Sequence, residues 1–196
     1  MDRMVTSTVV TGVGGQGVVS AADVVASVAF DAGLDVKKSD IHGMAQRGGT
    51  VVSFVRCGEK IYSPIVEQGT ADFLIALEEL EALRGIGFLK DRGVVILPNF
   101  RIPPPEVALG YRAYPGNIEG RLLEIRPGIE CHEADVKGML KQHPGYSINM
   151  FSLHLTKLTL PYEKAVWLDA IRQRFKKHDT AIDSFLYGYA RGTDDS

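Results

Sequence analysis

The sequence has 196 residues, of which 45% are hydrophobic and 23% charged, and its formal net charge is −2. A chain of this length can bury roughly 70% of its unfolded surface, so we expect a single domain over residues 1–196 that needs no disulfide or metal for stability. The balanced charge argues against a nucleic-acid-binding protein. No apolar stretch approaches the roughly 20 residues of a membrane span, and the first residues lack a signal-peptide pattern. A cytoplasmic location is therefore expected.

The two cysteines, Cys57 and Cys131, are far apart in the sequence and neither belongs to a Cys-x-x-Cys pair. Metal and iron–sulfur sites need three or four ligands, which usually stand at short spacings. We therefore expect no metal site in this chain, and two chemically inert thiols.

The expected elements alternate between strands and helices over the first half of the chain. Strands are predicted at residues 5–13, 34–41, 50–57, 60–66, 73–77, 94–97 and 129–134. Helices are predicted at residues 18–32, 78–84 and 145–158, from Pro161 onward, and after a capping Asp179. Residues 98–128 are rich in proline and glycine, and we expect an irregular segment with at most short strands.

Two pairings follow from this order. The strands at 50–57 and 60–66 are expected to form an antiparallel hairpin through Gly58 and Glu59, with Pro64 at a sheet edge. The strand–helix–strand order of residues 73–97 predicts a parallel pair with a right-handed crossover.

A glycine-rich loop follows the first predicted strand. It reads Gly12-Val13-Gly14-Gly15-Gln16-Gly17 and opens a helix, which satisfies the pattern G-x-G-x-x-G in its usual context. Such a loop directs backbone N–H groups at a helix N-terminus, where an anion is favoured. The alternative is that the glycines serve only the packing of helix on strand.

Two specific forms of phosphate binding are disfavoured. A P-loop requires Lys and then Ser or Thr after the last glycine, whereas Val18 and Val19 stand here. A dinucleotide site requires an acidic residue about 20 positions on, at the end of a good second strand. Asp35 and Asp40 have plausible spacing, but the strand around them is short and polar.

A second loop precedes the strand at residues 50–57 and carries the polar candidates His42, Gln46 and Arg47 together with Gly48 and Gly49. The small residues allow a ligand or another backbone to approach closely, and the polar side chains supply directional hydrogen bonds. We expect a contact surface for a partner or cofactor. The alternative is a loop ordered only by its own hydrogen bonds.

The fold predicted from these elements is α/β. We expect three layers with a mostly parallel central sheet, a Rossmann-like first βα unit, an antiparallel hairpin, and a helical C-terminus packed against the sheet.

Over residues 8–99 the sequence resembles the gamma-type subunits of the 2-oxoacid:ferredoxin oxidoreductases, and is most similar to the beta subunit of indolepyruvate oxidoreductase. The segments that carry this resemblance are GVGGQGVVSAADVVA, SDIHGMAQRGGTVVSFVRCG, IYSPIV, ADFLIALEELEALR and GVVILPN, in that order. Two independent loops in the right order are far more specific than either glycine pattern alone.

The resemblance implies a division of labour between subunits. A larger partner subunit would carry thiamine diphosphate and the iron–sulfur clusters, and the complex would oxidatively decarboxylate an aryl or alkyl 2-oxoacid to an acyl-coenzyme A with ferredoxin as electron acceptor. This chain would carry no catalytic residue and would be inactive alone.

The same resemblance suggests roles for the two loops. Residues 12–17 would form an anion cradle that touches substrate or coenzyme A, and Arg47 would bind a carboxylate or phosphate. His42 and Gln46 would make polar contacts across the subunit boundary. The competing interpretations are a stand-alone NAD(P)-binding oxidoreductase and a non-catalytic scaffold subunit.

Overall fold

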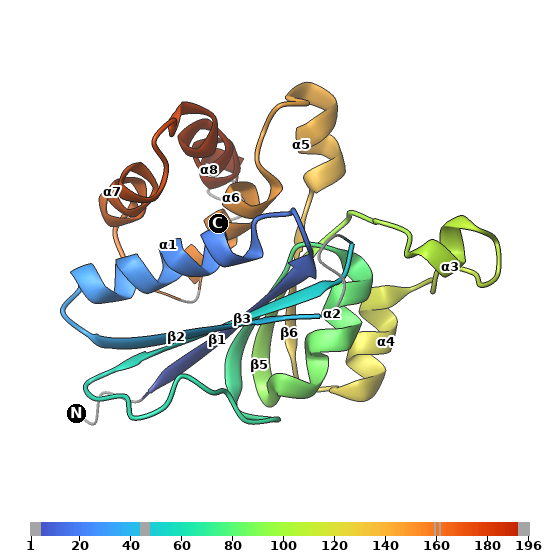
Figure 1. Cartoon of the computed structure of the whole chain (residues 1–196), viewed down its shortest axis with the longest axis horizontal. Coiled ribbons are helices and arrows are strands. Elements are labelled where there is room, and N and C mark those ends of the chain that lie inside the picture. The colour runs from blue at the N-terminus through green and yellow to red at the C-terminus, as the bar shows by residue number, and fades with distance from the viewer. Residues whose placement is uncertain (1–4, 44–47, 159, 161, 192–196) are drawn as a thin grey trace.

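The protein is described by a computed structural model that places residues 5–43, 48–158, 160 and 162–191. Six strands in this described part form one sheet in the order β2–β3–β1–β4–β5–β6 (Figure 1). Their bounds are β1 Thr6–Val13, β2 Asp35–His42, β3 Thr50–Gly58, β4 Ala71–Ala76, β5 Leu89–Pro98 and β6 Glu130–Ala134. Strands β1, β4, β5 and β6 pair in parallel, and β3 is antiparallel to both β1 and β2. The predicted mostly parallel sheet is confirmed.

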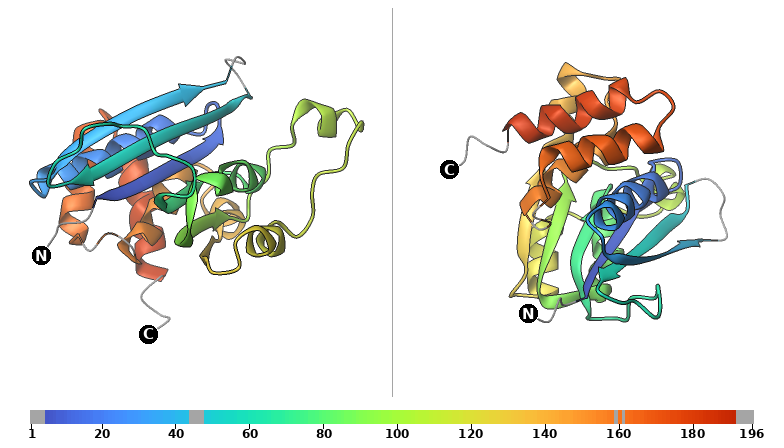
Figure 2. Two further views of the ribbon diagram at one scale, coloured as in Figure 1. Left: turned by 90° about the horizontal axis from the view of Figure 1, so that it is seen from below. Right: turned by 90° about the vertical axis from the view of Figure 1, so that its left-hand side faces the viewer.

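Helices cover both faces of the sheet, which confirms the three-layer α/β prediction (Figures 1 and 2). One face carries α1 (Val18–Asp31), and the other carries α2 (Glu79–Gly85) and α4 (Ile118–Ile125). The 3-10 turn η1 (Ile86–Phe88) leads from α2 into β5, and the short helix α3 (Pro105–Ala108) lies on an arm that projects from the body.

Alternation along the strands separates two hydrophobic clusters. Val10 of β1 and Ile96 of β5 face α1, whereas their neighbours Val9 and Val95 face α2 and α4. Successive side chains of a strand point to opposite faces, and β-branched residues fill both sides here, as in a sheet covered by helices on both faces.

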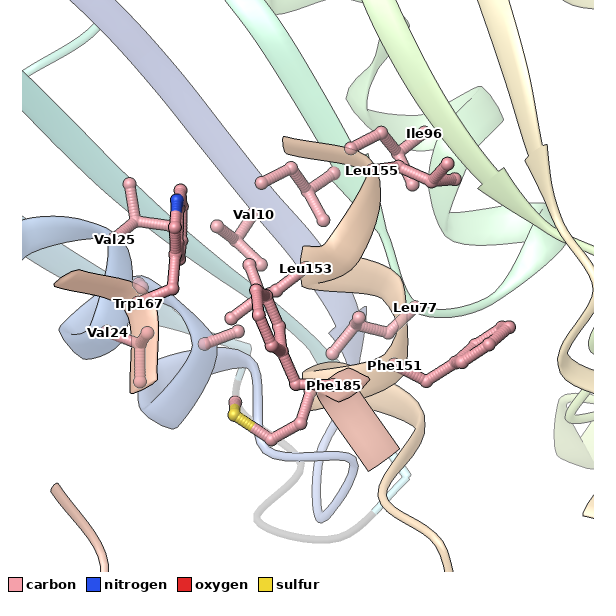
Figure 3. Packing of buried hydrophobic residues seen from close by; sticks show 14 of the residues in the cluster. Val10, Val24, Val25, Leu77, Ile96, Phe151, Leu153, Leu155, Trp167 and Phe185 are labelled. Atoms are coloured by element: carbon pink, nitrogen blue, oxygen red, sulfur yellow. The ribbon is translucent and has the colours of Figure 1, made fainter. Parts of the chain in front are cut away.

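The C-terminal region adds α5 (Val136–Gln142), α6 (Ile148–Leu153), η2 (His154–Leu158), α7 (Lys164–Arg174) and α8 (Asp179–Arg191). Leu153 and Leu155 join the cluster that contains Val10 and Ile96, so this part reaches the sheet (Figure 3). In contrast, α7 packs on α1, with Trp167 beside Val25, and α8 packs on α6. The prediction that the C-terminus packs on the sheet therefore holds for α6 and η2, with α7 and α8 forming an outer tier.

The predicted strand at residues 60–66 is wrong. β3 pairs with β1 on one side and β2 on the other, so neither of its edges is free for a further strand. The segment is held by side chains instead: the Ile61 N–H donates to Asp35 (2.8 Å), and Arg56 donates to the carbonyl of Ser63 (3.1 Å). An antiparallel pair near the edge is present, but β2 and β3 form it.

Residues 98–128 also differ from the prediction, because they contain helices α3 and α4 rather than short strands. Asn117 caps α4 by accepting a hydrogen bond from the Gly120 N–H (3.2 Å), and the buried Ile118 and Leu122 hold the helix on the sheet. Helix α5 was not predicted.

The predicted boundaries of the last helices are corrected in one respect. Asp179 is the first residue of α8 rather than its cap, since the carbonyl of His178 accepts from the Ile182 N–H (2.8 Å). Pro161 lies outside the described residues. No helix among the residues that the structure describes combines the length and apolar character of a membrane span.

Candidate functional site

The candidate site lies where the helices that follow β1 and β4 diverge. These strands are parallel neighbours, but β1 leads into α1 on one face and β4 leads into α2 on the other (Figure 1). In open α/β sheets such a switch point leaves a crevice at the carboxyl ends of the strands, and ligands bind there. The glycine loop closes one side of this crevice.

Backbone geometry explains the glycines of the loop. Gly15 and Gly17 adopt φ angles of 100° and 84°, in the region that disfavours L side chains. A Cβ at Gly12 would lie 2.9 Å from Cγ2 of Val18 and 3.1 Å from Cβ of Leu77, whereas a Cβ at Gly15 would meet nothing within 4 Å. Gly12 therefore serves close packing of helix on strand, and Gly15 leaves open space beside the turn.

Gln16 fastens the loop to the end of β4. Its Oε1 accepts from the Val13 N–H and its Nε2 donates to the Leu77 carbonyl, each at 2.7 Å. Both polar atoms of the side-chain amide therefore bind within the protein. A contact between Gln16 and substrate or coenzyme A, which the sequence suggested, remains a prediction.

A residue of the C-terminal region, Asn149 in α6, holds the same loop. Asn149, only 4% exposed, donates from Nδ2 to the Gly17 carbonyl (3.0 Å) and accepts at Oδ1 from the Ser147 hydroxyl (2.7 Å) and the Met150 N–H (3.0 Å). A Cβ at Gly17 would lie 2.3 Å from that Nδ2. This link was not predicted from the sequence, because the two residues are 132 positions apart.

The structure brings the described parts of the two predicted loops together. The Gly14 N–H donates to the Gly49 carbonyl (2.9 Å), and the exposed His42 lines the same cavity as Gly14, Gly15 and Gly17. This cavity has a volume of about 350 Å³. It opens at the N-terminus of α1, where none of the described side chains caps the helix, so backbone N–H groups there can receive an anion.

The remaining predicted site residues are placed differently. Gly48, with φ of 75°, lines a neighbouring cavity, described below. Gln46 and Arg47 lie outside the described residues.

Three buried carboxylates stand at the start of α2, on Glu78, Glu79 and Glu81, and were not identified from the sequence. Glu78 accepts from the Tyr114 hydroxyl, the Ile102 N–H (3.1 Å) and the Glu81 N–H (3.0 Å). Burial, followed by the hydrogen bond to Glu78, raises the pKa of Tyr114. Glu78 therefore ties both ends of the projecting segment 102–114 to α2. The available signal was three acidic residues directly after a buried parallel strand.

Glu81 has a different environment. Its Oε1 accepts from Arg84 and from the Thr50 hydroxyl (3.1 Å), whereas its Oε2 is buried and has no hydrogen-bond partner in the described part of the chain. Burial raises the pKa of this carboxyl, and Arg84 only partly offsets the effect. Glu79 pairs instead with Arg101, on the far side of the helix start (2.6 Å).

The geometry does not support a dinucleotide site. The antiparallel β3 lies between β1 and β2, so the second strand is not next to the strand that ends in the glycine loop. The carboxylates proposed for a ribose are occupied as well. Asp35 accepts from the Ile61 N–H, and Asp40 accepts from Ser53 (2.7 Å) and Lys38 (2.8 Å).

The thiols stand apart from the site. Cys57 lies on β3 and Cys131 on β6, with β1, β4 and β5 between them. Burial raises the pKa of each thiol to about 11, so both stay protonated at neutral pH. Among the described residues, no three His, Cys, Asp or Glu side chains are grouped to hold a metal ion.

Comparison with known protein families gives a match over most of the chain. Residues 7–190 match the family described as pyruvate ferredoxin/flavodoxin oxidoreductase. The indolepyruvate oxidoreductase subunit IorB of Methanothermobacter thermautotrophicus is 32% identical over 190 residues, which cover 92% of this chain and 94% of that protein. The IorB subunit of Thermococcus kodakarensis is 44% identical over 107 residues, or 55% of this chain. The chain spans only 53% of the length of that relative.

Solved structures share the fold. Pyruvate oxidoreductase subunit PORC of Thermotoga maritima aligns with a TM-score of 0.68 and 17% identity, over 95% of this chain and 96% of that one. The 2-oxoglutarate:ferredoxin oxidoreductase of Magnetococcus marinus aligns with a TM-score of 0.71 and 18% identity, over 98% of this chain and 31% of that one. That structure holds 2-oxoglutarate, coenzyme A and succinyl-CoA.

Proposed function

The chain belongs to the pyruvate ferredoxin/flavodoxin oxidoreductase family, and on that premise we propose that it is a subunit of a thiamine-diphosphate-dependent 2-oxoacid oxidoreductase complex. The reaction proposed for the complex is the oxidative decarboxylation of a 2-oxoacid, indolepyruvate-like or pyruvate-like, to an acyl-coenzyme A. Ferredoxin would accept the electrons. The observation that carries this proposal is the family match over residues 7–190, together with relatives named as indolepyruvate oxidoreductase and pyruvate synthase subunits.

We assign the redox and thiamine chemistry to a larger partner subunit. An iron–sulfur cluster needs several thiolates at one place. The two thiols of this chain are protonated and separated by three strands, so its cysteines do not fit a cluster. The contribution of this chain is then shape and hydrogen-bond donors at a shared boundary.

The glycine-loop cavity fits an anionic group such as a phosphate of coenzyme A. Backbone N–H groups at the N-terminus of α1 supply the donors, and the open space beside Gly15 allows close approach. Coenzyme A, when bound, supplies the thiol that accepts the acyl group. Gln16 and Asn149 keep the loop in shape for this contact. The Magnetococcus marinus protein, which shares this fold over 31% of its chain, holds coenzyme A, and this supports coenzyme A as a ligand of the proposed complex.

His42 and Gln46 are proposed as polar contacts across the subunit boundary. His42 is exposed at the rim of the glycine-loop cavity, which is consistent with such a contact. Arg47, always charged and able to bind bidentately, is proposed to hold a carboxylate or phosphate. An Arg47→Ala variant should raise KM for the 2-oxoacid or coenzyme A by about tenfold or more, consistent with loss of one charge-assisted contact. Unchanged assembly, KM and turnover would remove Arg47 from the site.

The decisive experiment is reconstitution. The chain is co-expressed with a candidate thiamine- and iron–sulfur-containing subunit, and reduction of ferredoxin or a viologen dye is measured with indolepyruvate or pyruvate and coenzyme A. We expect turnover by the complex and none by either subunit alone. Sustained dye reduction by the isolated chain supplied with cofactors would overturn the proposal.

The two competing functions are tested by different experiments. The first is a calorimetric titration of the isolated chain, and the second compares the complex with and without this chain. Micromolar binding of NAD(H) or NADP(H) would favour the stand-alone oxidoreductase, for which the strand order gives no support. A complex whose turnover and coenzyme A dependence are the same without this chain would favour a non-catalytic scaffold.

A further inference from the structure

A second cavity adjoins the glycine-loop cavity and has no role in the function proposed above. We call it the proline cavity: it has a volume of about 280 Å³, with Glu78, Glu81 and Arg84 on one side and Pro103, Pro104 and Pro105 on the other. Val13 lines both cavities, and Gly48 of the second loop lines the proline cavity. The proline cavity therefore belongs to the same face of the molecule as both loops.

On the charged side of the proline cavity, one carboxylate oxygen has no hydrogen-bond donor among the described residues. Glu78 has three donors for its two oxygens. Nη1 of Arg84 donates hydrogen bonds to both Glu81 and Thr50. Two carboxylates thus face one guanidinium, and Oε2 of Glu81, a residue only 1% exposed, has no donor among the described residues. Buried acceptors are nearly always paired, so this oxygen is open to a donor that the described residues do not supply.

The opposite wall is apolar and pre-shaped. Three consecutive prolines have fixed φ angles, and Glu78 anchors the segment that carries them at Ile102 and at Tyr114. Arg101 stacks on the Tyr114 ring at 4.9 Å, which further fixes the base of the arm. A ligand entering here meets an apolar wall on one side and a net negative charge on the other.

We propose that the proline cavity receives a lysine or arginine side chain of the larger partner subunit. The methylene stem would lie along the prolines, as long basic side chains do on apolar surfaces, and the charged head would donate to Oε2 of Glu81. This inference rests on the proposed function, because it takes the face that carries both loops to be the subunit boundary. Charge complementarity and continuity with that face favour a partner's side chain over a small ligand.

The test compares two carboxylate-to-amide variants of one helix. Glu81→Gln removes the proposed charge, and Glu79→Gln removes a carboxylate that pairs with Arg101 and lines a different cavity. The dissociation constant for the purified partner subunit is measured by surface plasmon resonance for the full-length chain and each variant. We expect Glu81→Gln to weaken binding about 10- to 100-fold, as for loss of a charge-assisted hydrogen bond, and Glu79→Gln to change it less than twofold.

Thermal stability separates this role from a structural one. Because burial raises the pKa of Glu81, its ionised form costs folding free energy at neutral pH, and Glu81→Gln should keep or raise the melting temperature. A second pair of variants tests the cavity while leaving the sequence of α2 unchanged. Ala108→Phe fills the proline cavity from the exposed arm and should weaken binding, whereas Ala113→Phe, also exposed but outside the cavity, should not.

The outcomes are distinguishable. If the unmodified chain binds no partner subunit, the proposed function and this inference both fall. If it binds, but Glu81→Gln binds within twofold of it or Glu79→Gln is equally impaired, only this inference is overturned. Saturable binding of n-butylammonium to the isolated chain that is lost in Glu81→Gln, with partner affinity unchanged, would also overturn it in favour of a small cationic ligand.

Discussion

Replacing Gly17 or Gly15 with alanine should separate two reasons for glycine in the loop. Both residues have positive φ, so both variants pay the cost of an L side chain in that region, about 1–2 kcal/mol. Only at Gly17 would the new Cβ strike another group, Nδ2 of Asn149 at 2.3 Å. The Asn149 amide must then move, and its hydrogen bonds with Gly17, Ser147 and Met150 weaken or break.

The magnitude follows from those contacts. Each hydrogen bond contributes about 0.5–1.5 kcal/mol, so loss of two of them adds about 1–3 kcal/mol to the cost of Gly17→Ala. For a chain of this size 1 kcal/mol corresponds to about 2–4 °C in melting temperature. We expect Gly17→Ala to melt about 4–8 °C below Gly15→Ala, which corresponds to a difference of about 2 kcal/mol.

Thermal and urea unfolding followed by circular dichroism measure the difference. The double variant Gly17→Ala/Asn149→Ala provides the control: without the amide the clash disappears, so the two changes should cost at least about 1 kcal/mol less together than the sum of the single changes. Equal melting temperatures for Gly15→Ala and Gly17→Ala, or additivity in the double variant, would refute the contact as the reason for Gly17.

Three further predictions concern neighbouring contacts. Gln16→Ala removes the acceptor of the Val13 N–H and the donor to Leu77, so unfolding free energy should fall by about 1–3 kcal/mol and the Val13 amide should exchange faster with solvent; unchanged exchange would contradict this. Glu78→Ala releases both ends of the 102–114 arm, so limited proteolysis should cut it faster than in the control Glu106→Ala. Hydrogen bonds from Asn99 and then Gly138 lower the pKa of Asp135. A lowered pKa stabilises the fold above the unfolded-state pKa, and this contribution is lost as pH falls below about 4; acid unfolding of Asp135→Asn should show a weaker pH dependence in that range.

The sequence predicted the layers of the fold because its signals there are local. A β-branched run, glycines and an apolar stretch up to residue 31 determine β1, the loop and α1 without reference to the rest of the chain. The same holds for β4, α2 and β5, whose strand–helix–strand order also gives their parallel pairing. The Gly14–Gly49 hydrogen bond, which joins the two loops, was not predicted, because it links separate segments of the chain.

The failures share a physical cause, which is competition between distant segments. Residues 60–66 have strand-like composition, but β2, although it carries two lysines, already occupies the edge of β3 that they would need. The buried carboxylates of α2 resemble an ordinary solvated helix start until Tyr114, Ile102 and Thr50 are brought to them from elsewhere. No sequence pattern within α2 predicts those hydrogen-bond partners.

The bond between Asn149 and the Gly17 carbonyl has a consequence for biosynthesis. The brace emerges from the ribosome 132 residues after the turn that it holds, a delay of roughly 7–26 s at the usual rates of translation. A nascent chain therefore carries this glycine turn without its brace for most of its elongation. The turn should reach its folded shape only when α6 docks, so a fragment that ends before α6 would lack this brace.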